Sequence, residues 1–235
     1  MPKNEFTQSR LTASREELAQ LSRRKFLGFA GAAAGIVVVA AGCKKEDLPS
    51  NSVLDGVDLG SGDPGILNYA YALEQLEAAF YTQVIMSQYS GISATETALL
   101  TDIRDHEIAH REFFKTALGS AAIIDLEFDF SSVDFGSRDS VLATAKAFED
   151  LGVSAYNGAG RLIETADYLV LAGKIVSVEA RHAAWIRDII SNGSFADDSV
   201  IDMNGLDVTR KPTEVLEIAK TYITTEINAS NLPTY

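Results

Sequence analysis

Two Glu–His pairs in this chain have the spacing that places both side chains on one face of a helix. Glu107 and His110 are three residues apart, and Glu179 and His182 repeat that spacing later in the chain. Residues three apart are neighbours on an α-helix surface. Carboxylate and imidazole ligands favour iron or manganese over metals that prefer thiolates. The two pairs therefore indicate metal-ligand chemistry built on two helices.

A second matched pair of residues precedes each Glu–His pair. Glu74 and Tyr81 are seven residues apart, and so are Glu149 and Tyr156. The order Glu, Tyr, Glu, His thus occurs twice, which indicates a two-fold internal repeat. Seven residues span about two helical turns, so each tyrosine is expected above its glutamate. There it would hydrogen-bond a ligand or act as a redox-active neighbour; the alternative is a plain core aromatic.

The repeat supplies one carboxylate from each of four expected helices and one imidazole from each of two. This is the arrangement of di-iron and di-manganese carboxylate sites. Four carboxylates balance the charge of two divalent ions, whereas without metal they repel one another and take up protons. The predicted ligands of two Fe or two Mn ions are Glu74, Glu107, His110, Glu149, Glu179 and His182.

The edges of this ligand set stay open. Glu77, one turn from Glu74, is an alternative ligand; Glu74 is preferred because its spacing to Tyr81 matches the second repeat. His106 faces about 100° away from Glu107 and is interpreted as a surface residue or as support for a ligand. Other candidates for orienting the histidines are Asp102, Asp105, Arg111 and Arg181.

Four stretches with apolar residues at helical spacing carry the predicted ligands. We expect helices over residues 64–89, 93–118, 139–158 and 165–190. Asp63 and Pro64 open the first, and a capping box at Ser93 opens the second. Gly152 inside the third helix costs about 1 kcal/mol relative to alanine and indicates a bulge or a close helix contact.

Residues 120–138 show no continuous helical face and predict a long connection that crosses back along the bundle. The chain is thus expected to be an all-α four-helix bundle with a long crossover between the second and third helices. A short helix after Pro212 is expected to pack outside the bundle, and the last residues are expected to be frayed.

The N-terminal segment has the features of an export signal. Arg23 and Arg24 precede an apolar run and resemble a twin-arginine (Tat) motif. Cys43, the only cysteine, ends the run as in a bacterial lipobox; the alternatives are an ordinary cleavage site and an uncleaved anchor. We expect a lipoprotein held in the periplasm or cell envelope by Cys43. The expected divisions are a signal peptide at 1–42, a flexible tether at 43–63, the bundle at 64–191 and a C-terminal extension at 192–235.

The composition of the chain argues against some classes of binding partner. The formal net charge of -13 and the pI near 4.6 argue against nucleic acid and anionic lipid headgroups. A single cysteine excludes an intrachain disulfide framework and a cysteine-rich metal site.

Four segments together resemble the ferritin-like superfamily, and within it the bacterial ferritin-like domain branch related to plant desiccation-related proteins. They are LNYAYALEQLEAAFY, HEIAHREFF, FEDLGVSAYNGAG and VEARHAAWIRDI. The resemblance covers roughly residues 64–191 and implies a ferritin-like bundle with a dinuclear site. The cysteine pairs typical of rubrerythrins do not occur in this sequence.

The expected function is that of an exported dimetal protein reacting with dioxygen or peroxide, as an oxidase, peroxidase or catalase-like enzyme in oxidative-stress protection. The alternative is a non-enzymatic envelope protein for stress or desiccation protection, with structural metal or none. Iron storage in a cage is less favoured, because a lipid anchor and a C-terminal extension suit a closed shell poorly. A homodimer is kept as one oligomeric state.

Overall fold

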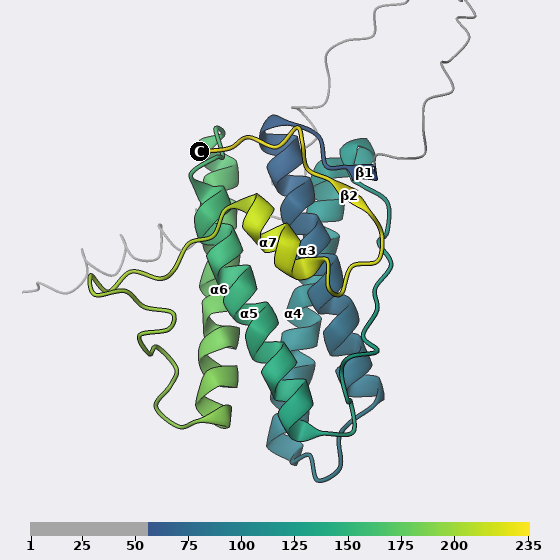
Figure 1. Cartoon of the computed structure of the whole chain (residues 1–235), viewed down its shortest axis with the longest axis vertical. Helices are drawn as coiled ribbons and strands as arrows, with labels where there is room; N and C mark the ends of the chain where they lie inside the picture. Colours follow the sequence, from purple (N-terminus) through teal and green to yellow (C-terminus); the bar gives the residue numbers. More distant parts are fainter. Residues whose placement is uncertain (1–55) are drawn as a thin grey trace, which may run out of the picture. The chain divides into compact units, whose positions relative to one another are not determined.

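A computed structural model describes residues 56–235 of the chain; Arg23, Arg24, Cys43 and most of the expected tether lie outside the described residues. Four long helices form a bundle, in which α3 packs on α4 and α5 packs on α6 (Figure 1). The expected all-α bundle is therefore confirmed. In chain order the elements are β1 (Val57–Asp58), α3 (Gly62–Met86), α4 (Ala94–Leu118), the 3-10 turn η1 (Gly119–Ala121), α5 (Arg138–Gly160), α6 (Ala166–Ile190), α7 (Pro212–Ala219) and β2 (Ile227–Asn228).

The helix ends follow the signals in the sequence. At the start of α4, the Ser93 hydroxyl accepts a hydrogen bond from the Glu96 backbone N–H at 3.1 Å. The Glu96 carboxylate in turn accepts one from the Ser93 backbone N–H at 3.1 Å, so the capping box is confirmed. Helix α3 ends at Met86, slightly before the expected position.

The crossover from α4 to α5 is fixed to α3 by two buried polar side chains. Asn68 Oδ1 accepts a hydrogen bond from the Ile123 backbone N–H at 3.0 Å. Gln75 Oε1 accepts one from the Leu126 backbone N–H at 2.8 Å. These bonds satisfy backbone groups that the irregular segment would otherwise bury unpaired. The crossover therefore takes a defined path beside α3.

Aromatic side chains from the crossover complete one side of the core. The rings of Phe130 and Phe135 lie 5.8 Å and 6.0 Å from the ring of Phe80 in α3. Phe148 of α5 packs edge-on against the same ring at 5.0 Å. The connection thus belongs to the hydrophobic core that joins α3 and α5.

The two ends of the described chain meet in a small parallel sheet. β1 pairs with β2, with Val57 opposite Ile227 (Figure 1). Leu59 is fully buried and Leu232 is nearly so. Two expectations are corrected here. The end of the expected tether belongs to the folded unit, and the last residues are not frayed, because strand pairing and core packing hold them.

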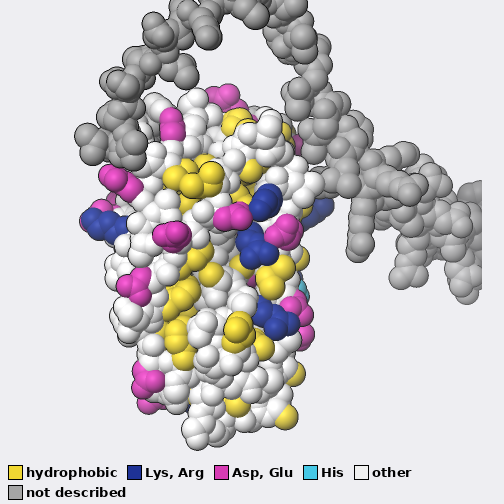
Figure 2. Space-filling view, turned by 90° about the vertical axis from the view of Figure 1, so that its right-hand side faces the viewer, with side chains coloured by type: hydrophobic (Ala, Val, Ile, Leu, Met, Phe, Trp, Pro, Cys, Tyr) yellow, Lys and Arg dark blue, Asp and Glu magenta, His cyan; other side chains and the backbone are white. Residues whose placement is uncertain are grey.

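Acidic and basic side chains are interspersed with short apolar stretches on the face shown in Figure 2. Between residues 56 and 235, no helix combines the length and the hydropathy that crossing a membrane requires.

Candidate metal centre

The structure brings all six predicted ligands together in two overlapping groups. Within each group, the ligand atoms lie within 4.8 Å of one another. Glu107 and Glu179 belong to both groups, as two carboxylates that bridge a pair of ions would. The first group is Glu74, Glu107, His110 and Glu179, and the second is Glu107, Glu149, Glu179 and His182. Every one of the four long helices contributes.

Each histidine points its Nδ1 atom at the carboxylate carried by the other Glu–His helix. His110 Nδ1 on α4 lies 2.8 Å from Glu179 Oε1 on α6. His182 Nδ1 on α6 lies 2.9 Å from Glu107 Oε1 on α4. The two Glu–His pairs therefore interlock across the bundle centre, and Nδ1 is the nitrogen that each imidazole offers to a metal ion.

The donor atoms at this centre fit bound cations. All four carboxylates are at most 1% exposed. Unsatisfied polar atoms in such a position are costly, unless an ion completes their interactions. Of the eight buried side-chain atoms in residues 56–235 that lack a hydrogen bond, six lie at this centre: Glu74 Oε2, both carboxylate oxygens of Glu107, His110 Nδ1, Glu149 Oε2 and Glu179 Oε1. They belong to the two groups, so the residues present fit bound metal.

Without bound metal, burial favours the protonated forms of Glu74 and Glu149, and carboxylate neighbours favour those of the two histidines. Burial raises the pKa of Glu149 to about 7 and raises that of Glu74. Burial would lower the pKa of His110 and His182, but their carboxylate neighbours raise it to about 12 in each. Burial also acts to raise the pKa of Glu179, yet its contacts with both histidines lower it. Metal ions must displace these protons, so binding is expected to weaken as the pH falls.

The tyrosine of each repeat hydrogen-bonds the first glutamate of the other repeat. The Tyr81 hydroxyl on α3 donates a hydrogen bond to Glu149 Oε1 on α5. The Tyr156 hydroxyl on α5 donates one to Glu74 Oε1 on α3. The spacing in the sequence predicted that each tyrosine lies above the glutamate of its own repeat. In the structure, each one bonds the glutamate of the opposite repeat. Burial, followed by the charge of the bonded glutamate, raises the pKa of both hydroxyls, so both remain donors.

His106 supports a predicted ligand. Its Nδ1 lies 2.9 Å from Nε2 of His182, and the two rings are nearly parallel at 7°. The contact leaves Nδ1 of His182 free to face the carboxylates. His110 has no matching imidazole, so the two halves of the centre differ. Three of the other orienting candidates bond elsewhere: Asp105 to Arg104, Arg111 to Glu112, and Arg181 to Ser177.

Glu77, the alternative ligand, is a fifth buried carboxylate beside the centre. It is 3% exposed and lies outside both ligand groups, whereas Glu74 belongs to one. Burial, and then the charge of Glu107, raises its pKa well above the ordinary range. A Cβ atom on Gly152 would lie 3.1 Å from Glu77 Oε1. The close contact expected at Gly152 is therefore with this carboxylate.

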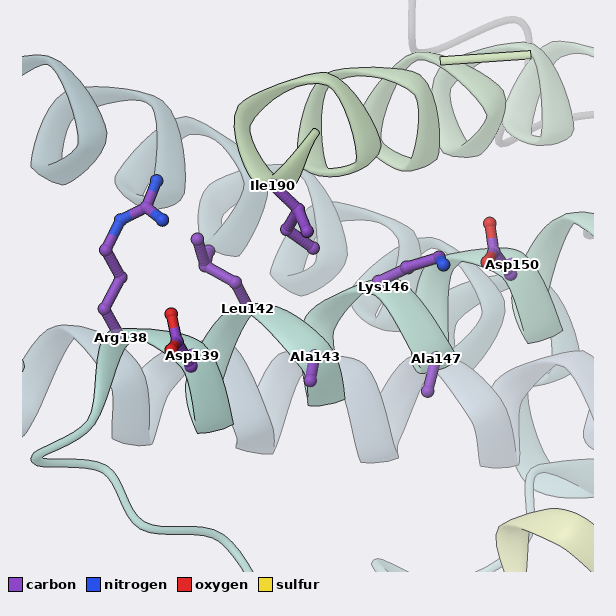
Figure 3. Close-up of a pocket in the computed structure, with 8 residues that line it drawn as sticks. All are labelled: Arg138, Asp139, Leu142, Ala143, Lys146, Ala147, Asp150 and Ile190. Carbon is purple, nitrogen blue, oxygen red and sulfur yellow. The ribbon is translucent and has the colours of Figure 1, made fainter. Parts of the chain in front are cut away.

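A wider surface groove lies along α5, next to the end of α6, and is separate from the metal centre (Figure 3). Two of its four charged side chains already have partners. Arg138 pairs with Glu96 at 2.7 Å, and Asp150 pairs with Arg187 at 2.7 Å. The groove therefore offers fewer free charges to a ligand than its composition suggests.

Comparison with known proteins agrees with this geometry. The profile of the family described as "Ferritin-like domain" matches residues 62–192. No curated protein matches the chain significantly. The matched range begins with α3, extends just past α6 and contains all six predicted ligands. The chain belongs to the ferritin-like domain family.

Proposed function

We propose that this protein holds two iron or manganese ions and uses them for redox chemistry on dioxygen or peroxide, in oxidative-stress protection. One observation carries the proposal: two groups of four buried donors share Glu107 and Glu179. A single structural ion needs only one such group. Two groups with common carboxylates are suited to a coupled pair of ions.

Bound ions would supply a centre able to exchange electrons with a small oxidant. The chain's own residues would position that centre. Glu107 and Glu179 would help to hold both ions, Glu74 and His110 would hold one of them, and Glu149 and His182 would hold the other. The hydroxyls of Tyr81 and Tyr156 would hold one oxygen of each terminal carboxylate and aim the other inward. Burial would exclude bulk water and larger substrates.

Burial also favours the second candidate, a non-enzymatic envelope protein for stress or desiccation protection, with structural metal or none. The bridging and terminal carboxylates are almost fully enclosed, and the small cavity beside Glu77 has a volume of only about 10 Å³. The two candidates differ in one assay. A redox protein consumes peroxide or dioxygen when loaded with iron or manganese, whereas a structural one does not.

We further propose that the protein is exported by the twin-arginine route and anchored by a lipid on Cys43. The Arg23–Arg24 pair, the apolar run and the position of Cys43 support this proposal. Because that route carries folded proteins, it would allow the centre to take up its metal before export.

The test is metal content measured on residues 44–235 after anaerobic reloading with Fe²⁺ or Mn²⁺. The wild-type chain is expected to hold about two ions. Glu107→Gln removes a shared carboxylate and should lose both ions, whereas Glu74→Gln removes a terminal one and should lose mainly one. Glu112→Gln, an exposed change on the same helix as Glu107, is the matched control.

Two results would contradict the dinuclear assignment. One is a wild-type chain that binds neither metal, which would leave the bundle as a scaffold and favour the protective role. The other is full metal content in Glu107→Gln. Peroxide consumption by the loaded wild type then separates redox chemistry from structural metal.

A further inference from the structure

The internal repeat is broken at one position next to the metal centre. Glu77 follows Glu74 by three residues, and its counterpart three residues after Glu149 is Gly152. The two counterparts face each other, because a Cβ on Gly152 would lie 3.1 Å from Glu77 Oε1. One repeat therefore adds a carboxylate, and the other removes the side chain that would press on it.

Glu77 is buried without a partner. Within residues 56–235, its carboxylate makes no side-chain hydrogen bond and no ion pair, although Tyr81 and Tyr156 hold the neighbouring Glu149 and Glu74. The negative charges of four nearby carboxylates act on it: Glu107, Glu179, Glu149 and Glu74. An unpartnered carboxylate in such a field is suited to binding a cation.

The Glu77 carboxylate lies at a small cavity between α3 and α5. Among the residues that line it, Glu77 alone is ionisable; the others are Leu73, Leu76, Phe148, Leu151 and Gly152. The cavity volume of about 10 Å³ accommodates about one water molecule. Glu77 is the residue of this lining whose side-chain oxygens could replace the water of an arriving cation.

We propose that Glu77 and the cavity beside Gly152 form an uptake site for divalent cations, from which an ion passes to the dinuclear centre. The proposal rests on the proposed dimetal function. Glu77 binds the arriving ion transiently, and the shared carboxylates then retain it. Gly152 keeps the space in which the Glu77 carboxylate lies.

A competing approach exists at His110, whose side chain is 14% exposed. Nδ1 of His110, however, already lies 2.8 Å from Glu179 Oε1. Within the described residues, no side chain holds the Glu77 carboxylate in this way. Glu77 is therefore the group next to the centre that is more readily available to an arriving ion.

The test is the rate of Co²⁺ uptake by the metal-free protein, followed anaerobically by visible absorption in a stopped-flow instrument. Glu77→Gln should slow uptake at least about tenfold, because it removes the carboxylate that would bind the arriving ion. The final content should stay at the two ions of the wild type, since the ligand groups are intact. Gly152→Ala should also slow uptake, because its Cβ displaces the Glu77 carboxylate.

Matched controls exclude a general folding effect. Alanine is a better helix former than glycine, so Gly152→Ala should not unfold α5. Gly173→Ala in α6, where a Cβ would meet nothing within 4 Å, should take up Co²⁺ at the wild-type rate. Glu112→Gln removes an exposed carboxylate and should do the same.

Two results would overturn the uptake site. If Glu77→Gln takes up two Co²⁺ ions at the wild-type rate, ions arrive elsewhere and the dimetal function stands. If Glu77→Gln saturates with fewer ions than the wild type, Glu77 is a permanent ligand. Absence of Co²⁺ binding by the wild type is a different failure, because it removes the dimetal function itself.

Discussion

The contact between His106 and His182 makes the two halves of the centre unequal. The ligand residues are symmetric, and so are the two tyrosine hydrogen bonds. Only His182, however, has a second imidazole on its outer nitrogen, 2.9 Å away. Such outer partners fix the orientation of a metal-binding ring. The half of the centre that contains His182 should therefore hold its ion more rigidly.

Replacing His106 tests this difference. In His106→Ala, the affinity of one of the two ions should fall about 10- to 100-fold, because His182 loses the partner that orients it. An anaerobic Co²⁺ titration would show one weakened step beside one unchanged step. Asp105→Ala, which removes an exposed neighbour bonded to Arg104, is the control. Two unchanged steps in His106→Ala would show that the contact does not position His182.

At the scale of elements, the crossover depends on polar side chains inside the bundle. Asn68 is 4% exposed and holds the crossover through Ile123 and Ala121. Asn68→Ala leaves these backbone groups unpaired and should lower the free energy of unfolding by about 1–3 kcal/mol, despite the better helix propensity of alanine. Urea denaturation measures this loss.

Gln83→Ala is the matched control for that experiment. Gln83 lies on the same helix, and its side chain donates a hydrogen bond to the Ser87 hydroxyl near the surface. Its replacement should change the free energy of unfolding by less than about 0.5 kcal/mol. Equal effects of the two substitutions would show that the bonds to the crossover contribute nothing particular.

The four helices and the assembly of the six predicted ligands could be predicted from the sequence because both depend on local spacing. A Glu–His pair three residues apart lies on one face wherever its helix packs. The partners of Asn68 could not be predicted, because Ala121, at the end of η1, and Ile123, in the irregular segment after it, lie far along the chain. The bonds of Tyr81 and Tyr156 to the opposite repeat were missed for a related reason. Spacing within one helix says nothing of how two helices are placed side by side.

At the scale of the whole molecule, the proposed export predicts in which cell fraction each variant is found. Replacing both Arg23 and Arg24 with lysine should keep the chain in the cytoplasm, since the paired arginines are what the Tat route reads. Cell fractionation measures how much of the protein stays in the cytoplasm. Arg10→Lys, in the same N-terminal segment, should be exported normally.

Lipidation is tested on the same cells. Cys43→Ser should move the exported protein from the membrane fraction to the soluble fraction, because it removes the thiol that would carry the lipid.

Export of the double lysine variant at the normal level would contradict the Tat assignment. Membrane association of Cys43→Ser would contradict the lipid anchor.

The pairing of β1 with β2 sets an order of events during synthesis. Val57 leaves the ribosome long before Ile227, its partner in the sheet. The four long helices are complete by Ile190, whereas β1 must wait until almost the whole chain has been translated. β1, which precedes the bundle, therefore pairs with its partner strand only after the four long helices have been synthesised. A chain cut short before Ile227 would carry every predicted metal ligand and still leave β1 unpaired.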